Sequence, residues 1–259
     1  MSNVKECLIL AAGNGTRIRA ASGYRPKPLV EFRGKPLLEH IIMNARGAGI
    51  ERFTVVIGYR ADLMRAWFAQ QWLDGVSVHF VENPDYHKQN GVSALKARGA
   101  IKDDFLLLMA DHIFEAGTAR RLIHQPLASG DVILAVDSRI HKVFDLDDAT
   151  KVRRSGADIV DIGKEISNYD ALATGMFLCS PMLFETLESV MKNGDCSLSD
   201  GMRRLAAERR FHAFDIGNAE WQDVDTPEAL AYADTMFTGA AAGLYSTPRK
   251  EATGSLCAH

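Results

Sequence analysis

The sequence predicts one α/β domain built on a mainly parallel, doubly wound sheet. Short β-rich runs alternate with helical patterns, an order typical of parallel strands covered by helices on both faces. The chain has 259 residues, of which 47% are hydrophobic and 24% charged, which is enough apolar material for one large core. The first apolar run leads directly into a glycine-rich turn, as at the carboxyl edge of an open α/β sheet.

Five runs in the first half are predicted as strands because they are short, apolar and bounded by polar, glycine or proline positions. They span residues 5–12, 53–58, 76–81, 105–109 and 132–137.

Two intervening segments, 36–49 and 61–73, carry apolar residues at helical spacing. Gly47 and Gly49 lie where the first of these helices would end. We expect both apolar stripes to pack in the core. Their members are Leu37, Leu38, Ile41, Ile42 and Ala45 in the first segment and Leu63, Ala66, Trp67 and Phe68 in the second.

After about Ser138 the alternation loosens, and residues 150–164 predict a hairpin that turns at Ser155 and Gly156. We expect a small inserted lobe here. The domain is predicted to span residues 1–237, and the small, polar, aperiodic segment 238–259 is expected to be a flexible tail or a linker. The remaining predicted elements are a strand at 172–180, helices at about 181–192 and 198–209, a strand at 211–216 and a last helix at 227–237.

The composition argues against several classes of partner. Thirty basic and thirty-three acidic residues leave a formal charge of -3, so the chain lacks the positive field of a nucleic-acid or membrane-surface protein. The longest apolar runs fall short of the ~20 residues that cross a bilayer, and CLILAA near the start is too short for a signal-peptide core. We therefore expect a cytoplasmic protein with reduced, scattered cysteines, and leave a homodimer open.

Residues 8–29, LILAAGNGTRIRAASGYRPKPL, have the layout of a phosphate-binding loop. Gly13 and Gly15 permit unusual dihedrals that let consecutive N–H groups point at one anion. Arg17 and Lys27 add cations, and two prolines stiffen the chain around Lys27. The pattern differs from GxGxxG, because Ile18 takes the last position, and from the Walker motif. The alternative is a plain turn that binds nothing.

The segment LAAGNGTR at 10–17, followed by PKPL at 26–29, resembles the signature of the nucleotidyltransferases that condense a nucleoside triphosphate with a sugar phosphate or alcohol phosphate. The resemblance covers about residues 5–237 and implies a Rossmann-like fold whose inserted lobe binds the acceptor. Within this family, the sequence most resembles the inositol-1-phosphate cytidylyltransferase branch. The further matching segments are GKPLL at 34–38, MADH at 109–112, DDATK at 147–151, IGK at 162–164 and WQDVDTP at 221–227.

The resemblance implies that Asp111 and Asp225 hold a Mg²⁺ ion, which prefers oxygen ligands. Asp111 follows an apolar strand, and Asp225 precedes the last predicted helix. The alternatives are that Asp111 is a turn residue and that Asp223 or Asp225 only caps that helix. Asp223 is also the rival to Asp225 as second metal ligand.

The resemblance also implies three catalytic cations and two binding regions. Arg17 would meet the β- and γ-phosphates, Lys27 the α-phosphate or the bridging oxygen, and Lys164 the acceptor's phosphate. The alternative is that these cations lie on the surface. The predicted acceptor residues are Thr174, Gly175 and His112, of which His112 is otherwise structural. Within the loop 89–93, the alternative is that Asn90 or Ser93 only caps a helix. The predicted nucleotide-binding residues are Leu10, Ala11, Ala12, Gly13, Asn14, Gly15, Thr16, Asn90, Gly91, Ser93 and Ala110.

The expected function is a Mg²⁺-dependent cytidylyltransferase that forms a CDP-alcohol and pyrophosphate from CTP and a phosphorylated alcohol resembling inositol 1-phosphate. Sugar 1-phosphates, phosphocholine and aminoethylphosphonate stay open as acceptors. A non-catalytic nucleotide-binding regulatory domain is the rival from another class. Phosphocholine would call for an aromatic cage, with Trp221, Tyr169 and Tyr86 as candidates, and a polyol for hydrogen-bonding side chains, with Asp145, Asp147, Asp161 and Asn168 as candidates.

Overall fold

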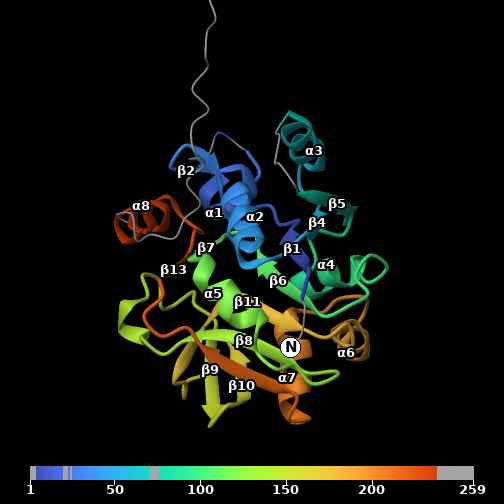
Figure 1. Cartoon of the computed structure of the whole chain (residues 1–259), viewed down its shortest axis with the longest axis vertical. Helices are drawn as coiled ribbons and strands as arrows, with labels where there is room; N and C mark the ends of the chain where they lie inside the picture. The colour runs from blue at the N-terminus through green and yellow to red at the C-terminus, as the bar shows by residue number, and fades with distance from the viewer. Residues whose placement is uncertain (1–3, 20–22, 24, 71–75, 238–259) are drawn as a thin grey trace, which may run out of the picture.

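The computed structural model describes residues 4–19, 23, 25–70 and 76–237, and within them the predicted α/β class is confirmed (Figure 1). The tail predicted at 238–259 lies outside the described residues. A nine-stranded sheet forms the centre. In sheet order its strands are β5 (Ser77–Glu82), β4 (Arg52–Ile57), β1 (Glu6–Ala11), β6 (Phe105–Met109), β11 (Ala171–Cys179), β8 (Val132–Asp137), β12 (Phe211–Asp215), β10 (Asp158–Gly163) and β9 (Lys151–Ser155).

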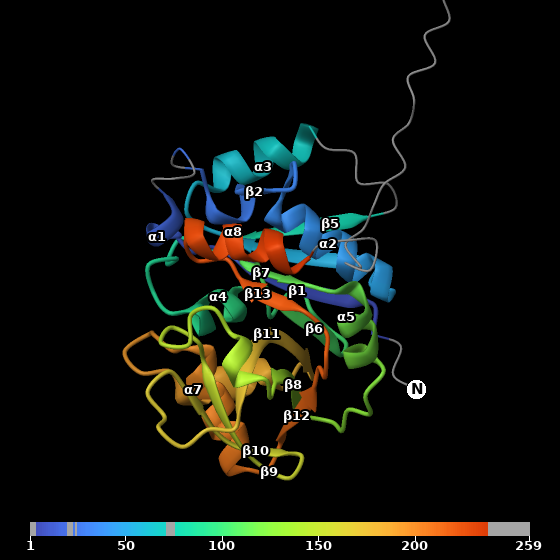
Figure 2. The ribbon, with the colours of Figure 1, turned by 90° about the vertical axis from the view of Figure 1, so that its left-hand side faces the viewer.

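The sheet is parallel in its first half and mixed beyond it. β1 pairs in parallel with β4 and β6, and β4 pairs in parallel with β5. β11 then runs antiparallel to both β6 and β8, while β12 returns to a parallel pairing with β8. The five strands predicted in the first half are all present. Figure 2 shows the sheet running the length of the molecule, from β5 at one end to β9 and β10 at the other.

The segment expected as an inserted lobe is the β9–β10 hairpin, which turns at Ser155 and Gly156 as predicted. It is continuous with the main sheet, because β10 pairs with β12 and β9 pairs with β10 and β11. The connection at 138–150 contains a short 3-10 helix, η2 (Ile140–Lys142), and lies beside the ends of these strands. The segment predicted as a separate acceptor-binding lobe therefore forms one edge of the main sheet.

Helices cover both faces of the sheet, and β1 shows why its residues form a continuous apolar run. Ile9 packs in the core cluster of the α2 side, whereas Leu8 and Leu10 pack in the cluster of the α4 side. The first cluster is covered by α2 (Leu37–Ala48), α3 (Ala61–Gln70) and α5 (Ala116–Ile123), and the second by α4 (Asn90–Lys96), α6 (Leu183–Val190) and α7 (Leu198–Ala207).

The two predicted apolar stripes differ in their outcome. The α2 stripe is fully buried. The α3 stripe is only half buried: Met64 is the buried residue and Ala66 is exposed. The reason is position, since α3 lies over the edge strand, where Phe68 contacts Phe80 of β5 edge to face.

Two short strands that the sequence analysis missed position the site. β7 (His112–Phe114) pairs antiparallel with β13 (Trp221–Asp223), which aligns His112 with Asp223. The backbone N–H of Val224 also donates to the carbonyl of Asp111, at 2.9 Å. With three residues each, these strands carry no readable alternation. They bring the two predicted metal-binding segments together from distant parts of the chain.

The smaller elements complete the fold. The segment that follows the glycine-rich turn contains α1 (Thr16–Arg19), the 3-10 helix η1 (Lys27–Leu29) and a hairpin of β2 (Glu31–Phe32) and β3 (Lys35–Pro36). The last helix, α8 (Pro227–Met236), packs against this segment. Ile18, Val30 and Phe32 are buried together there. Cys7, Cys179 and Cys196 are buried free thiols. Among the helices that the structure describes, none has the length and apolar character needed to cross a bilayer.

Candidate active site

Two cavities open at the carboxyl ends of β1 and β6, and they share a wall. The first, which we call the loop cavity, is lined by Leu10, Ala11, residues 13–17, Lys27, Pro28, Ala110, Asp111 and Asp225. The second, the strand-end cavity, includes Asp111, Asp225, His112, Lys164 and Gly175 in its lining. Asp111 and Asp225 therefore line both.

The glycine-rich turn lines the loop cavity. Gly15 has φ +53°, and a Cβ there would come within 2.7 Å of Cβ of Lys27, so the lysine passes directly beside the turn. Ala12 lies behind the cavity: it is buried, and its carbonyl accepts a hydrogen bond from the N–H of Tyr59 at 2.9 Å. Its predicted contact with nucleotide stays a prediction.

Lys27 is the central cation of the site. Only 7% of it is exposed, and its Nζ lies 2.8 Å from Oδ2 of Asp111 and also contacts Asp225. Asp223 Oδ1 is 3.7 Å away. Burial alone would lower the pKa of Lys27, but the three surrounding carboxylates outweigh it and raise the pKa above its usual value. Lys27 is therefore charged and fixed in place.

The pKa values of Asp111 and Asp223, two of the carboxylates around Lys27, shift in opposite directions. The pKa of Asp111 falls well below its usual range because Lys27 and His112 outweigh the opposing effect of burial. Burial raises the pKa of Asp223 to about 7, and the neighbouring Asp111 and Asp225 add to this rise, while His112 and Lys27 oppose it. The nearby cations therefore do not fully offset the cost of burying a negative charge on Asp223.

The carboxylate arrangement fits a divalent cation. Oδ1 of Asp223 is buried and has no hydrogen-bond partner among the described residues. Ligand atoms of Asp111, His112 and Asp223 lie within 4.8 Å of one another, as do those of Asp148, Asp223 and Asp225. Asp223 belongs to both groups, so the structure places it between the two predicted ligands rather than apart from them.

The alternative that Asp223 or Asp225 only caps the last helix does not hold. The N-cap of α8 is Thr226, whose Oγ1 accepts a hydrogen bond from the N–H of Ala229 at 3.1 Å. Both aspartates therefore keep their carboxylates for the site.

His112 is held in the strand-end cavity by its neighbours. Its Nδ1 lies 2.6 Å from Oδ1 of Asp111, and its ring stacks on Trp221 with centroids 5.9 Å apart. Burial opposes its charge, but Asp223 and Asp111 outweigh this and raise its pKa to about 9. Gly175, with φ +72°, leaves room for the ring, because a Cβ there would lie 2.7 Å from Cδ2 of His112.

The prediction that Thr174 binds the acceptor is corrected by its position in the structure. It is fully buried, and its Oγ1 donates to the carbonyl of Ala135 at 2.8 Å, within the sheet. Successive side chains of a strand point to opposite faces, so Thr174 turns away where Gly175 faces the cavity. Its hydroxyl is thus committed to joining β11 and β8.

In the loop predicted to contact the base, some residues line the cavity and others pack in the interior. Asn90 lines the strand-end cavity, and its Oδ1 accepts from the N–H of Leu198 at 2.9 Å. Gly91 is needed for packing, because a Cβ would lie 2.6 Å from the carbonyl of Cys196. Ser93 is a correction: it is buried, and its Oγ accepts from Asn83 Nδ2 at 2.9 Å.

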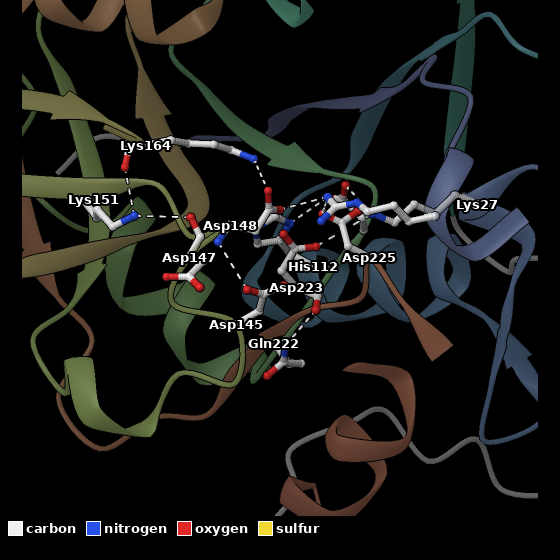
Figure 3. A network of polar contacts seen from close by, with 12 residues as sticks. Lys27, His112, Asp145, Asp147, Asp148, Lys151, Lys164, Gln222, Asp223 and Asp225 are labelled. Atoms are coloured by element: carbon white, nitrogen blue, oxygen red, sulfur yellow. Dashed lines mark hydrogen bonds and ion pairs between the residues drawn. The ribbon is translucent and has the colours of Figure 1, made fainter. Parts of the chain in front are cut away.

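Arg17 and Lys164 meet at one carboxylate that the sequence analysis did not select. Nη2 of Arg17 lies 2.9 Å from Oδ2 of Asp148, while Lys164 Nζ binds Oδ1 of the same residue (Figure 3). Arg17 also contacts Asp225. Partial burial opposes the ionisation of Asp148, but its hydrogen bonds with Lys164 and Arg17 outweigh this and lower its pKa to about 2. The only signal was its place within the DDATK segment.

A second missed group supports the cavity wall. Trp221 Nε1 donates to Oδ2 of the buried Asp137 at 2.9 Å, and Arg139 binds the same carboxylate through Nε and Nη2. Asp137 ends β8 and Trp221 begins β13, so only folding brings them together. The group fixes Trp221, and through it the His112 ring.

The residues proposed for specific acceptors are dispersed. Trp221 lines the strand-end cavity, whereas Tyr169 faces Lys151 and Tyr86 packs against Tyr59. The candidate aromatic cage is therefore not assembled. Of the polyol candidates Asp145, Asp147, Asp161 and Asn168, Asp145 is the one that lines the cavity.

A comparison with known protein families assigns the chain to one of them. Residues 7–211 match the family described as MobA-like NTP transferase domain, so the chain belongs to that family.

Two curated proteins are similar to this chain over most of its length. The chain is 38% identical over 237 residues to the "Bifunctional IPC transferase and DIPP synthase" of Rubrobacter xylanophilus, covering 90% of this chain and 52% of that protein. The protein of the same name from Thermococcus kodakarensis is 31% identical over 235 residues, covering 90% of this chain and 50% of that protein. The chain thus spans about half the length of these curated relatives.

A solved structure is similar over nearly the whole described domain. It is the inositol-1-phosphate CTP transferase from T. maritima, with a TM-score of 0.78 and 28% identity, covering 88% of this chain and 91% of that one.

Proposed function

We propose that this chain is a Mg²⁺-dependent cytidylyltransferase that joins CTP to inositol 1-phosphate, forming a CDP-alcohol and releasing pyrophosphate. One observation carries the proposal: two cavities share a wall made by Asp111 and Asp225, with Lys27 at its centre. A triphosphate in the loop cavity and an acceptor in the strand-end cavity would meet at this wall. The likeness to the T. maritima transferase supports the choice of substrates.

The cations of this chain suit the task of bringing two anions together. Arg17 and the N–H groups of the glycine-rich turn would hold the β- and γ-phosphates. Lys27, fixed beneath the turn, would stabilise charge that grows on the α-phosphate, and Lys164 would orient the acceptor's phosphate. A cation on each side of the transferred phosphorus offsets the repulsion between the two substrates.

Asp111, Asp223 and Asp225 would hold the Mg²⁺ ion, and the buried Oδ1 of Asp223, which accepts no hydrogen bond from the described residues, supports this assignment. The ion would supply charge neutralisation and a fixed orientation for the triphosphate. Asp111 and Asp225 line both cavities, and Asp223 lines the strand-end cavity beside them.

The proposed preference for cytosine rests more on the similarity to the T. maritima transferase than on the residues that would contact the base. Asn90 lines the strand-end cavity, and its Oδ1 is occupied by the N–H of Leu198. A base held from the loop cavity would have to reach this second cavity, where Nδ2 is the donor for its carbonyl. Cytosine and uracil both carry such a carbonyl, and guanine carries one as well, so this contact alone does not distinguish among these three bases. Acceptor choice is better supported by the side chains present, since the aromatic cage for phosphocholine is not assembled.

Pyrophosphate release in a matrix of four triphosphates and several phosphorylated alcohols tests the proposal. We expect CTP with inositol 1-phosphate to exceed every other pair by at least about tenfold in kcat/KM, a difference of ~1.4 kcal/mol. The panel needs hexose 1-phosphates, phosphocholine and aminoethylphosphonate as competitors. Better turnover of UTP with a hexose 1-phosphate would contradict the cytidylyl assignment. Binding without any turnover would favour the regulatory alternative.

A further inference from the structure

Asp148 joins the two cavities through charge. It lies on the connection 138–150, and its two carboxylate oxygens bind cations that come from opposite sides of the site. Arg17 follows the glycine-rich turn, and Lys164 follows β10. If these cations hold the phosphates of the two substrates, Asp148 occupies both of them before either substrate arrives.

The backbone around Asp148 is held firmly on its far side. Lys151 Nζ donates to the carbonyl of Asp147 at 3.3 Å and to the carbonyl of Lys164 at 2.8 Å (Figure 3). The N–H of Asp148 itself donates to Asp145 Oδ1 at 3.2 Å. These bonds tie the chain beside Asp148 to the chain beside Lys164. The carboxylate is therefore aimed at both cations at once.

We propose that Asp148 couples the binding of the two phosphorylated substrates, by bridging Arg17 and Lys164 in the free enzyme and yielding one cation to each phosphate. This inference rests on the proposed function, because it takes Arg17 and Lys164 as the phosphate ligands. Asp148 is a positioning residue: it acts through the two cations and leaves the reacting atoms to Lys27.

The coupling follows from the bridge. A triphosphate that takes Arg17 breaks one of two ion pairs that fix the Asp148 carboxylate. The remaining pair with Lys164 then loses preorganisation, since one anchor of the side chain is gone. An acceptor phosphate consequently displaces Asp148 from Lys164 more easily when the triphosphate is already bound. By linkage, the acceptor favours triphosphate binding by the same factor.

The expected size of the coupling is modest because the pairs are partly exposed. The side chains of Arg17 and Lys164 are 44% and 50% exposed, and that of Asp148 is 27% exposed. Ion pairs in such settings contribute little individually, so we expect a coupling of about three- to fivefold.

Initial rates over a grid of CTP and inositol 1-phosphate concentrations test the coupling in the wild type, Asp148→Asn and Asp170→Asn. The measured quantity is the ratio of the apparent acceptor KM at low CTP to that at saturating CTP. Asp170 is a matched control, because it also pairs with an arginine, Arg154, and lies outside both cavities. We expect the ratio to fall about three- to fivefold in Asp148→Asn and to stay at the wild-type value in Asp170→Asn. An unchanged ratio in Asp148→Asn, even with altered KM values, would overturn the proposal.

A binding measurement separates this result from failure of the proposed function. Inorganic triphosphate carries the anionic charge without a base, and calorimetric titration in EDTA needs neither turnover nor metal. We expect Asp148→Asn to bind it about threefold more tightly than the wild type and Asp170→Asn to match the wild type. Equal or weaker binding by Asp148→Asn would show that the carboxylate does not compete for Arg17, whichever substrates the enzyme uses.

Discussion

Lys27 Nζ lies 2.8 Å from Oδ2 of Asp111, at the wall that separates the two cavities. The pair joins the segment after the glycine-rich turn to the end of β6. Because Lys27 is almost fully buried, its charge acts in an environment that screens it weakly. The predictions for the site follow from this arrangement.

Replacement of Lys27 by alanine should lower kcat on the order of 10²-fold while weakening triphosphate binding much less. The contact is expected to strengthen as charge builds on the α-phosphate in the transition state. Steady-state kinetics and calorimetric binding of CTP measure the two effects separately. Lys5→Ala, which removes an exposed pair with Glu51, is the control. Weaker binding of CTP with an unchanged kcat would assign Lys27 to ground-state binding.

Asp111→Asn and Asp225→Asn should each reduce turnover by about 10²-fold or more, equivalent to ~3 kcal/mol. The double variant should cost little more than the worse single one, because residues that act as a unit are not additive. Asp223→Asn should resemble them, since Asp223 belongs to both carboxylate groups. Asp234→Asn, on α8 and paired with Arg33, controls for charge. Full activity in EDTA would contradict the metal assignment.

Lys164→Ala should raise the KM of the acceptor, by about tenfold, with a smaller change in kcat and in the KM of CTP. The lysine lines the strand-end cavity, so its loss removes a charge that orients the acceptor rather than the triphosphate. Kinetics with each substrate varied in turn measure this split. Lys192→Ala is the control at a position outside both cavities. Unchanged acceptor kinetics would assign Lys164 to the surface.

Gly175→Ala should displace His112 and reduce kcat/KM for the acceptor by about tenfold or more. The added Cβ would lie 2.7 Å from Cδ2 of the imidazole, which is held between Trp221 and β11. Gly156→Ala is a matched control: its φ is also positive, at +65°, but a Cβ there meets nothing within 4 Å. Both variants should lose stability through backbone strain. Equal activity in both would show that the position of His112 is unimportant.

His40 should make the free energy of unfolding depend on pH. Burial lowers its pKa below the usual value, and its Nε2–H donates to the carbonyl of Phe32 at 2.7 Å. The unfolded chain therefore binds more protons, so stability falls as pH drops through the unfolded pKa of about 6.5. In urea titrations between about pH 7.5 and 5.5, His40→Gln should lose less stability than the wild type. The exposed His79→Gln should behave as the wild type. A wild-type slope in His40→Gln would contradict the assignment.

Sequence reasoning located the elements of the fold well where apolar patterns were long. All five strands predicted in the first half are present. Four of them are largely buried apolar runs, and β5 at the sheet edge alternates exposed and half-buried residues; both patterns are recognisable without the neighbouring strands. It missed β7 and β13, whose three residues each carry no period. It also placed Thr174 and Ser93 in the site, since a motif names positions without saying which way each side chain points.

The sequence by itself determined the loop cavity, because a strand, two glycines and the cations that follow are adjacent in the chain and need only local geometry to face one anion. The tertiary structure alone decided which distant carboxylates surround Lys27, since the β7–β13 pairing aligns Asp223 with His112. It alone brought Asp148 to Arg17 and Lys164. Such contacts depend on strand register and on a connection that crosses the sheet edge, and neither leaves a periodic trace in the order of the residues.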